Sequence, residues 1–417
     1  MAEKYIPFTE EMKKTHTILA PNMLPVHFKL YIQILRNCGY NIELLESESS
    51  SVTEAGLKYV HNDTCYPAIV VIGQFLEAVK SGRYDTDKIA LIMFQTGGGC
   101  RASNYIFLIR KALERAGYGH IPVISLSLAG LEKHPGFKLT LPMLYKMLYA
   151  TLYGDLIMLL ENQCKPYEVK KGSAKAVSDR LTKVLTDEMN KKHFSLVRIK
   201  RNYKRIIDEF GKIELKHEKK VKVGIVGEIF VKFSPAGNNG LERFLVSEGA
   251  EVVIPGFMDF MLYSIYDNIM DYRLYGRNKA QYPLYCTVLK FLEHEQKKVI
   301  DAVASDGRFR PSTPFSHTVS LVKDYIGYGC KMGEGWLLPA EMLELADSGV
   351  NNIVCTQPFG CLPNHIVGKG MMNPIKRRNP DVNIIAIDYD ASASEINQQN
   401  RIKLMLANAA EKLKTEN

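Results

Sequence analysis

The sequence predicts an α/β protein made of two successive parallel-sheet halves. Three observations support this fold class. Short β-rich runs alternate along the chain with amphipathic helical segments. Several of these runs are apolar at nearly every position, as strands are when helices cover both faces of a parallel sheet. The alternation restarts near residue 221, and 417 residues are enough for two or three domains.

In the first half, β-rich runs alternate with amphipathic helices. The run KIALIMF at 88–94 is almost continuously apolar, and a glycine-rich loop separates it from the next helix. The predicted strands are 15–21, 40–46, 88–94 and 121–128, and the predicted helices are 23–39 and 104–117.

In the second half, the same alternation returns. Helix 239–249 ends at its glycine, and the final helix is predicted to begin in a capping box formed by Ser392 and Glu395. A basic helical stretch at about 165–220 joins the halves, which predicts domains at 1–215 and 216–417. The predicted strands are 221–227, 250–256, 351–358 and 383–390.

The composition excludes disordered, fibrous and membrane-spanning chains. Hydrophobic residues make up 46% and charged residues 24% of the chain, as in ordinary globular proteins. The most apolar stretch, 141–161, contains Lys146, Asp155 and Glu161, which predicts a buried helix rather than a membrane span. Residues 1–14 lack the apolar core of a signal peptide. We therefore expect a cytoplasmic protein with reduced thiols.

The net charge of +9 would suit either nucleic acid or a phosphorylated cofactor. Much of the excess lies at 191–205 and 212–222, where it is typical of a solvated helix face. No motif of a nucleic-acid-binding module accompanies it, so nucleic acid is the weaker interpretation.

The eight cysteines are the main chemical signal. Cys65, Cys100 and Cys361 lie in loops rich in Gly or Pro, and Cys355 lies at a strand end. Such positions favour ligands, because ligands collect at the carboxyl ends of parallel strands. Cys38 and Cys286 lie on predicted helices and are expected to pack in the core, whereas Cys164 and Cys330 are intermediate.

Several common sites are excluded by spacing. The sequence has no C-x2-C zinc pair, no ferredoxin C-x2-C-x2-C run and no complete phosphate loop. GIVGE at 224–228 is not a dinucleotide motif. Single cysteines on separate strand-end loops can still converge on an iron–sulfur cluster between two domains, since a cluster needs only three or four thiolates close in space.

Six sequence blocks resemble the 2-hydroxyacyl-CoA dehydratase and benzoyl-CoA reductase superfamily. The resemblance extends from about residue 15 to 410 and is strongest to the dehydratase-like branch, which also occurs at the C-terminal end of large CoA-substrate activases. The blocks are HNDTCYPAIVVIGQ (61–74), QTGGGCRASNYIFLIRKAL (95–113), VGIVGEIFVKF (223–233), GEGWLLPAEM (333–342), CTQPFGCLPNHIVGKGM (355–371) and IDYDASASEINQQNRIKLML (387–406).

The resemblance implies two Rossmann-like domains with an iron–sulfur cluster between them, in a homodimer. It also implies a partner, a 4Fe–4S activase dimer that hydrolyses ATP and supplies low-potential electrons. One similar branch carries a double-cubane cluster, two bridged 4Fe–4S units, and reduces small molecules instead of acyl-CoA esters.

The number of cysteines bears on the choice of cluster. A single cubane with an open site needs three cysteine ligands, and a bridged pair needs six. Setting aside Cys38 and Cys286 leaves six of the eight, which favours the double cubane, with the single 4Fe–4S cluster as the alternative. The candidate ligands are Cys65, Cys100, Cys164, Cys330, Cys355 and Cys361.

Other residues near these cysteines are candidates for further roles. Arg101 would place positive charge beside an anionic cluster, and Gly98 and Gly99 would let the backbone approach it closely. Glu228 is expected to be structural. The candidate proton donors are His365, Glu334 and Gln95.

We therefore expect an anaerobic, dehydratase-like iron–sulfur oxidoreductase that receives electrons from the activase and reduces a small substrate at a double cubane. The alternatives are a 2-hydroxyacyl-CoA dehydratase component with a single cubane and a non-catalytic electron-transfer subunit.

Overall fold

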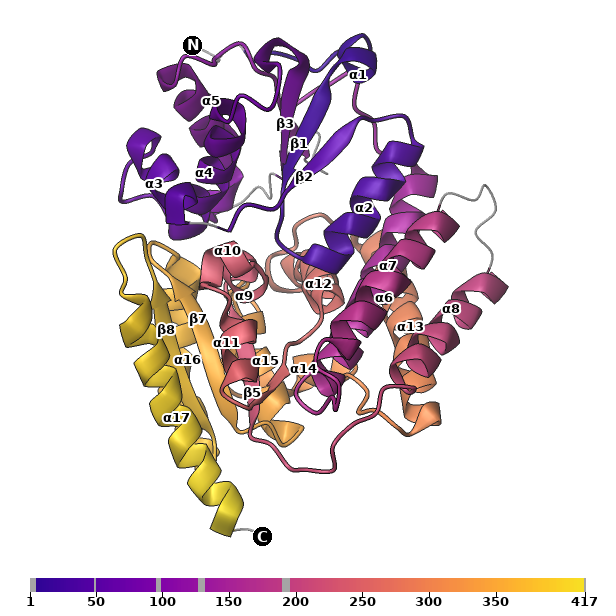
Figure 1. Ribbon diagram of the computed structural model, residues 1–417, viewed down its shortest axis with the longest axis vertical. Coiled ribbons are helices and arrows are strands. Elements are labelled where there is room, and N and C mark those ends of the chain that lie inside the picture. Colours follow the sequence, from indigo (N-terminus) through magenta and orange to yellow (C-terminus); the bar gives the residue numbers. More distant parts are fainter. Residues whose placement is uncertain (1–4, 49, 95–98, 127–131, 190–195, 416–417) are drawn as a thin grey trace.

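The computed structural model describes residues 5–48, 50–94, 99–126, 132–189 and 196–415. Within these ranges the chain is α/β, with one four-stranded parallel sheet in each half (Figure 1). All eight predicted strands are present, and within the described residues each is shorter than predicted by at least one residue. They were predictable because strands buried on both faces are apolar along their length.

The N-terminal sheet has the strand order β2-β1-β3-β4. Its faces alternate residue by residue: Ile18 and Ala20 point toward α2 and α6, whereas Leu19 points toward α4 and α5. The strands are β1 (Thr17–Pro21), β2 (Ile42–Leu45), β3 (Ile89–Phe94) and β4 (Val123–Leu126). The helices are α1 (Met12–Thr15), α2 (Pro25–Asn37), α3 (Ser50–Tyr59), α4 (Tyr66–Lys80), η1 (Thr86–Lys88), η2 (Arg101–Asn104) and α5 (Tyr105–Arg115).

The C-terminal sheet has the equivalent order, β6-β5-β7-β8. Its strands are β5 (Lys222–Gly227), β6 (Glu251–Val253), β7 (Asn352–Pro358) and β8 (Asn383–Tyr389). Its helices are α9 (Ile229–Phe233), α10 (Pro235–Asn238), α11 (Leu241–Ser247), α12 (Phe257–Tyr275), α13 (Tyr282–Asp306), α14 (Phe315–Val322), α15 (Leu337–Asp347), η3 (Asn364–Lys369), α16 (Gly370–Arg378) and α17 (Glu395–Thr415). In each sheet the crevice that α/β proteins use for ligands lies between the carboxyl ends of the two central strands.

Long helices line one side of both halves (Figure 1). They include α6 (Leu141–Cys164), α7 (Ser173–Met189) and α8 (Leu196–Phe210). By length and composition α6 is apolar enough to cross a membrane, but 61% of its apolar window is buried in the fold. This burial is what the sequence predicts for the helix at 141–161, and it is common in the core helices of soluble proteins.

Two local predictions are wrong. The final helix begins at Glu395, and Ser394 rather than Ser392 accepts a hydrogen bond from a first-turn N–H, that of Asn397 at 3.4 Å. The Ser392 hydroxyl instead donates to Asp390. Cys38 is exposed, because it lies at the C-cap of α2, beyond the helix face that packs in the core.

Asp155, in the middle of α6, joins the two halves. Its carboxylate accepts hydrogen bonds from the backbone N–H groups of Phe257 and Met258, both at 2.8 Å, and so caps α12. It also lies 2.8 Å from Nε2 of the buried His27 on α2. One carboxylate therefore holds helices from both halves.

Replacing Asp155 with Ala should lower the free energy of unfolding by about 2 kcal/mol, since the variant loses a helix cap and leaves buried polar groups without a partner. Urea denaturation followed by circular dichroism measures this change. The matched control is Asp179→Ala, at an exposed pair with Lys175, where the expected change is within about 0.5 kcal/mol. Equal stability losses in the two variants would contradict the assigned role of Asp155.

Candidate cysteine site between the two sheets

Three of the six predicted ligands lie at helix N-termini beside the carboxyl ends of the strands. Cys65 is the N-cap of α4. Cys100 is the N-cap of η2, which leads into α5, and its sulfur accepts a hydrogen bond from Ala102 N–H at 3.5 Å. Cys361 follows β7 and directly precedes the helical turn that leads into η3 and α16. Helix N-termini stabilise thiolates, because their free N–H groups and dipoles favour negative charge.

Close backbone contacts bring these three segments together. Tyr66 N–H donates to the carbonyl of Phe359 at 3.0 Å, which joins the start of α4 to the loop after β7. A Cβ on Gly360 would lie 3.0 Å from Cα of Cys65, and this glycine has a φ of +73°. A Cβ on Gly333 would lie 3.0 Å from Pro363 and 3.9 Å from the Cys100 sulfur. Only glycine suits both positions.

Burial disfavours the free thiolate of each of these three cysteines. Burial raises the pKa of Cys65, of Cys361 and of Cys100, the last to about 11. The negative charge of one thiolate raises the pKa of another, which indicates that the three lie near each other. The Cys65 sulfur also lies 3.1 Å from the hydroxyl of Tyr105, a neighbour that no sequence motif indicated.

Three cysteine thiols are a donor set that an iron–sulfur cluster would accept. In the part of the chain that the structure describes, no three His, Cys, Asp or Glu side chains are close enough to hold one metal ion. A four-iron cube binds one thiolate at each of three corners, so its ligands lie farther apart than those of one ion. Thiolates are the ligands that such clusters select.

Two buried glutamates lie beside the cysteines. Glu334 accepts a hydrogen bond from Ile229 N–H at 3.0 Å, and Glu228 caps α9 by accepting one from Val231 N–H at 2.9 Å. Burial raises the pKa of both carboxyl groups, and the charge of Glu334 raises the pKa of Glu228 further. The pair therefore retains a proton near neutral pH. Glu334 was a predicted donor, whereas Glu228 was expected to be only structural.

Behind this pair lies a buried ion pair. Lys232 Nζ and Glu341 Oε1 are 2.8 Å apart, and both side chains are at most 5% exposed. Together with Glu334 they line a cavity of about 10 Å³, which is close to the smallest space that holds a water molecule.

The remaining predicted residues have different surroundings. His365 is exposed on η3, with its Nδ1 hydrogen-bonded to the Gln357 side chain. Arg101 is exposed, and its guanidinium donates to the carbonyl of Asp63 at 2.6 Å. Gly99 packs on Met332, whose sulfur would lie 2.6 Å from an added Cβ. Gln95 and Gly98 lie outside the described residues.

The structure does not bring Cys164 to the other cysteines. It is the last residue of α6, and nearby Tyr167 donates a 2.7 Å hydrogen bond to Glu251, the first residue of β6. Cys164 therefore lies near the amino ends of the C-terminal strands, at the edge opposite to the one that Cys361 follows.

Cys330 and Cys355 lie on segments that form the site, but neither lies at a helix N-terminus as the other three cysteines do. Cys330 is exposed, in the loop that also carries Gly333 and Glu334. Cys355 is fully buried within β7 and packs in the hydrophobic core.

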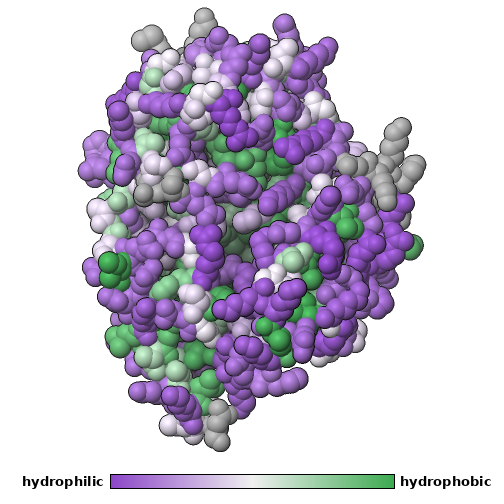
Figure 2. Space-filling view, in the orientation of Figure 1, coloured by the Kyte–Doolittle hydropathy of each residue, from purple (hydrophilic) through white to green (hydrophobic). Residues whose placement is uncertain are grey.

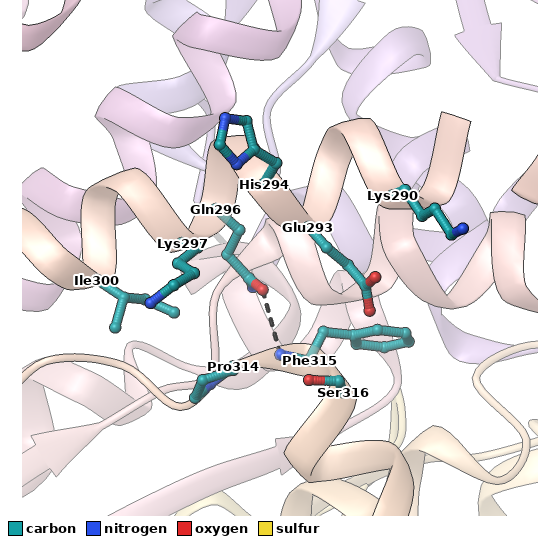
Figure 3. Close-up of a pocket in the computed structure, with 9 residues that line it drawn as sticks. All are labelled: Lys290, Glu293, His294, Gln296, Lys297, Ile300, Pro314, Phe315 and Ser316. Carbon is teal, nitrogen blue, oxygen red and sulfur yellow. Dashed lines mark hydrogen bonds between the residues drawn. The ribbon is translucent and has the colours of Figure 1, made fainter. Parts of the chain in front are cut away.

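The molecule has a hollow at the level between the two sheets and a separate surface pocket beside α13. The face shown in Figure 2 is hollowed near its centre, at the level between the two sheets. A separate surface pocket of about 270 Å³ lies between α13 and the start of α14 and shares no residue with the cysteine site (Figure 3). In it the Glu293 carboxylate lies at the N-terminal end of α14, close to Phe315 and Ser316, while Gln296 accepts a hydrogen bond from Phe315 N–H at 3.1 Å.

The loop that carries Glu334 is anchored by Trp336, the only tryptophan of the chain. Its indole N–H donates to Asp267 at 3.0 Å. Burial raises the pKa of Asp267 to about 7 from its ordinary value of 3.8, so ionisation of this group disfavours the folded state as the pH rises between these values.

We expect the tryptophan fluorescence of chelator-treated protein to change with pH, with a midpoint near the pKa of about 7 for Asp267. In Asp267→Asn this transition should disappear, and the variant should lose less stability between pH 4 and 7 than the wild type. Asp301→Asn, at an exposed pair with Lys297, is the control that should titrate like the wild type. An unchanged transition in Asp267→Asn would exclude this carboxyl as its origin.

Comparison of the chain with protein-family models and with curated proteins finds no match.

Proposed function

We propose that the chain is an iron–sulfur oxidoreductase component that takes low-potential electrons from a separate ATP-hydrolysing activase. In this proposal Cys65, Cys100 and Cys361 hold a 4Fe–4S cluster, and the electrons pass to a small bound substrate. When bound, such a cluster supplies one-electron transfer and, with only three protein ligands, an iron that is open to substrate.

The observation that carries the proposal is the convergence of three cysteines, the buried Cys65 and Cys361 and the half-buried Cys100, each at the start of a helix. A cluster with three thiolate ligands is anionic, and three helix N-termini together with the nearby Arg101 guanidinium offset that charge. The side-chain amide Nδ2 of Asn364 next to Cys361 is buried and has no hydrogen-bond partner among the described residues, so an acceptor brought by a bound group would satisfy it.

The chain's own residues also supply a proton. Reduction of a substrate and dehydration of a hydroxy acid both need a proton at the reacting group. Because Glu228 and Glu334 are buried and repel each other's charge, one of them holds a proton that it donates when substrate binds nearby. Small-molecule reduction is the first candidate reaction, and dehydration of a 2-hydroxyacyl-CoA is the alternative.

An apolar rim around the site supports docking of an electron donor. We define this rim by five apolar side chains that are at least 43% exposed and belong to the segments that meet at the cysteines. Contiguous exposed apolar residues mark interaction sites. The members are Phe94, Met332, Phe359, Leu362 and Ile366.

The double cubane with six cysteine ligands is a second version of the same proposal. Cys330 favours it, because it lies in the loop that also carries Gly333 and Glu334. Cys164 does not, since it lies at the opposite edge of the C-terminal sheet. The geometry therefore supports the single cubane best.

Protein purified without oxygen should contain about four irons and about four sulfides per chain. Cys65→Ser, Cys100→Ser and Cys361→Ser should each lose most of the iron, whereas Cys164→Ser and the control Cys286→Ser should keep it. Metal and acid-labile sulfide analysis measures these contents. About eight irons, with loss in Cys164→Ser, would replace the single cubane with the double cubane. Zinc or no metal in the wild type would refute the proposal.

Placing charge on the apolar rim should block electron delivery. In Leu362→Asp/Ile366→Asp, reduction by the activase with ATP should slow by about tenfold or more, since charged residues in an apolar interface cost more than 1 kcal/mol. Reduction by a small chemical reductant should stay unchanged. Val197→Asp, at a 79% exposed site on α8, is the matched control. An equal effect with both kinds of reductant would indicate damage to the site and not to docking.

A further inference from the structure

The position of Cys355 indicates a residue that supports the site and does not bind iron. It lies inside β7, where it is paired with Val226 of β5 on one side and Ala386 of β8 on the other, and it is fully buried. It also packs in the hydrophobic core of the protein. Close packing of this kind leaves no room for an iron beside the thiol.

The Cys355 thiol is hydrogen-bonded to a residue in the turn that follows Cys361. Its S–H donates to Oδ1 of Asn364 at 3.6 Å, within the range of sulfur hydrogen bonds. Asn364 is also fully buried, and it is the first residue of η3, three positions after Cys361. Asn364 therefore links Cys355 to the backbone that directly follows Cys361.

The backbone that begins at Asn364 is a π-helical turn, which the hydrogen bond from Cys355 helps to stabilise. Asn364–Lys369 forms a turn of π-helix, which is less stable than α-helix and is common at functional sites. Asn364 is the first residue of this turn, so a hydrogen bond that fixes its side chain fixes where the turn begins after Cys361.

We propose that Cys355 is a positioning residue and not an iron ligand: its thiol holds the Asn364 side chain and so fixes the start of the turn that follows Cys361. This inference rests on the proposed function, in which Cys361 is a ligand. The reduction potential of a cluster depends on the hydrogen bonding and solvent exposure around its sulfur ligands. Cys355 would thus tune the potential from outside the ligand set.

The test compares Cys355→Ala, which has no donor, with Cys355→Ser, whose hydroxyl donates to Asn364 as the thiol does. Cys361→Ser is the ligand control, and Cys286→Ala is the control for an unrelated cysteine. Amide hydrogen exchange on chelator-treated protein does not depend on iron. The segment 362–369 should exchange faster in Cys355→Ala than in the wild type, and at nearly the wild-type rate in Cys355→Ser.

With iron bound, Cys355→Ala and Cys355→Ser should keep the wild-type iron content. The potential of Cys355→Ala should differ from that of the wild type, and that of Cys355→Ser should return toward the wild-type value. Iron loss in Cys355→Ala comparable to that in Cys361→Ser would overturn the inference, as would exchange that is equal in all variants. A wild type without iron would instead refute the proposed function, and the exchange measurement would still decide whether Cys355 holds Asn364.

Discussion

The site depends on the way in which two parallel sheets meet. In each sheet the strands run in one direction, so the loops that follow the strands collect at one edge together with the N-termini of the next helices. The two edges face each other, and each contributes cysteines at the start of a helix. The parallel arrangement of the strands therefore brings the N-termini of several helices, which favour negative charge, to the cysteine site.

Glycine residues allow the backbones of the two halves to approach each other closely. Gly360 and Gly333 both have positive φ, and a side chain on Gly360 would press on Cys65 of the opposite half, whereas one on Gly333 would press on Pro363. Around them the protein places acids that are costly to bury as charges, Glu228 and Glu334, and a compensated pair, Lys232 and Glu341. A fold stabilised by packing alone would have no need of so many buried ionisable groups.

Much of this was predictable from the sequence, and the failures have physical causes. All eight strands were predictable, because a strand that is buried on both faces is apolar along its length. Cys65, Cys100 and Cys361 were found from their Gly- and Pro-rich loops. Cys164 was included by elimination among eight cysteines, and no pattern within one segment shows at which edge of a distant sheet a helix ends. The contact of Tyr105 with Cys65 and the repulsion between Glu228 and Glu334 arise only in three dimensions.

The role of Asp155 has a consequence for how the chain can be divided. Each half has its own sheet, yet the carboxylate that caps α12 in the second half comes from α6, which precedes that half in the sequence. A fragment that starts after α6 would begin with an uncapped helix and an uncovered apolar face, and one that stops within α6 would leave His27 buried without its partner. The Asp155 contacts therefore make the stability of each half depend on the presence of the other.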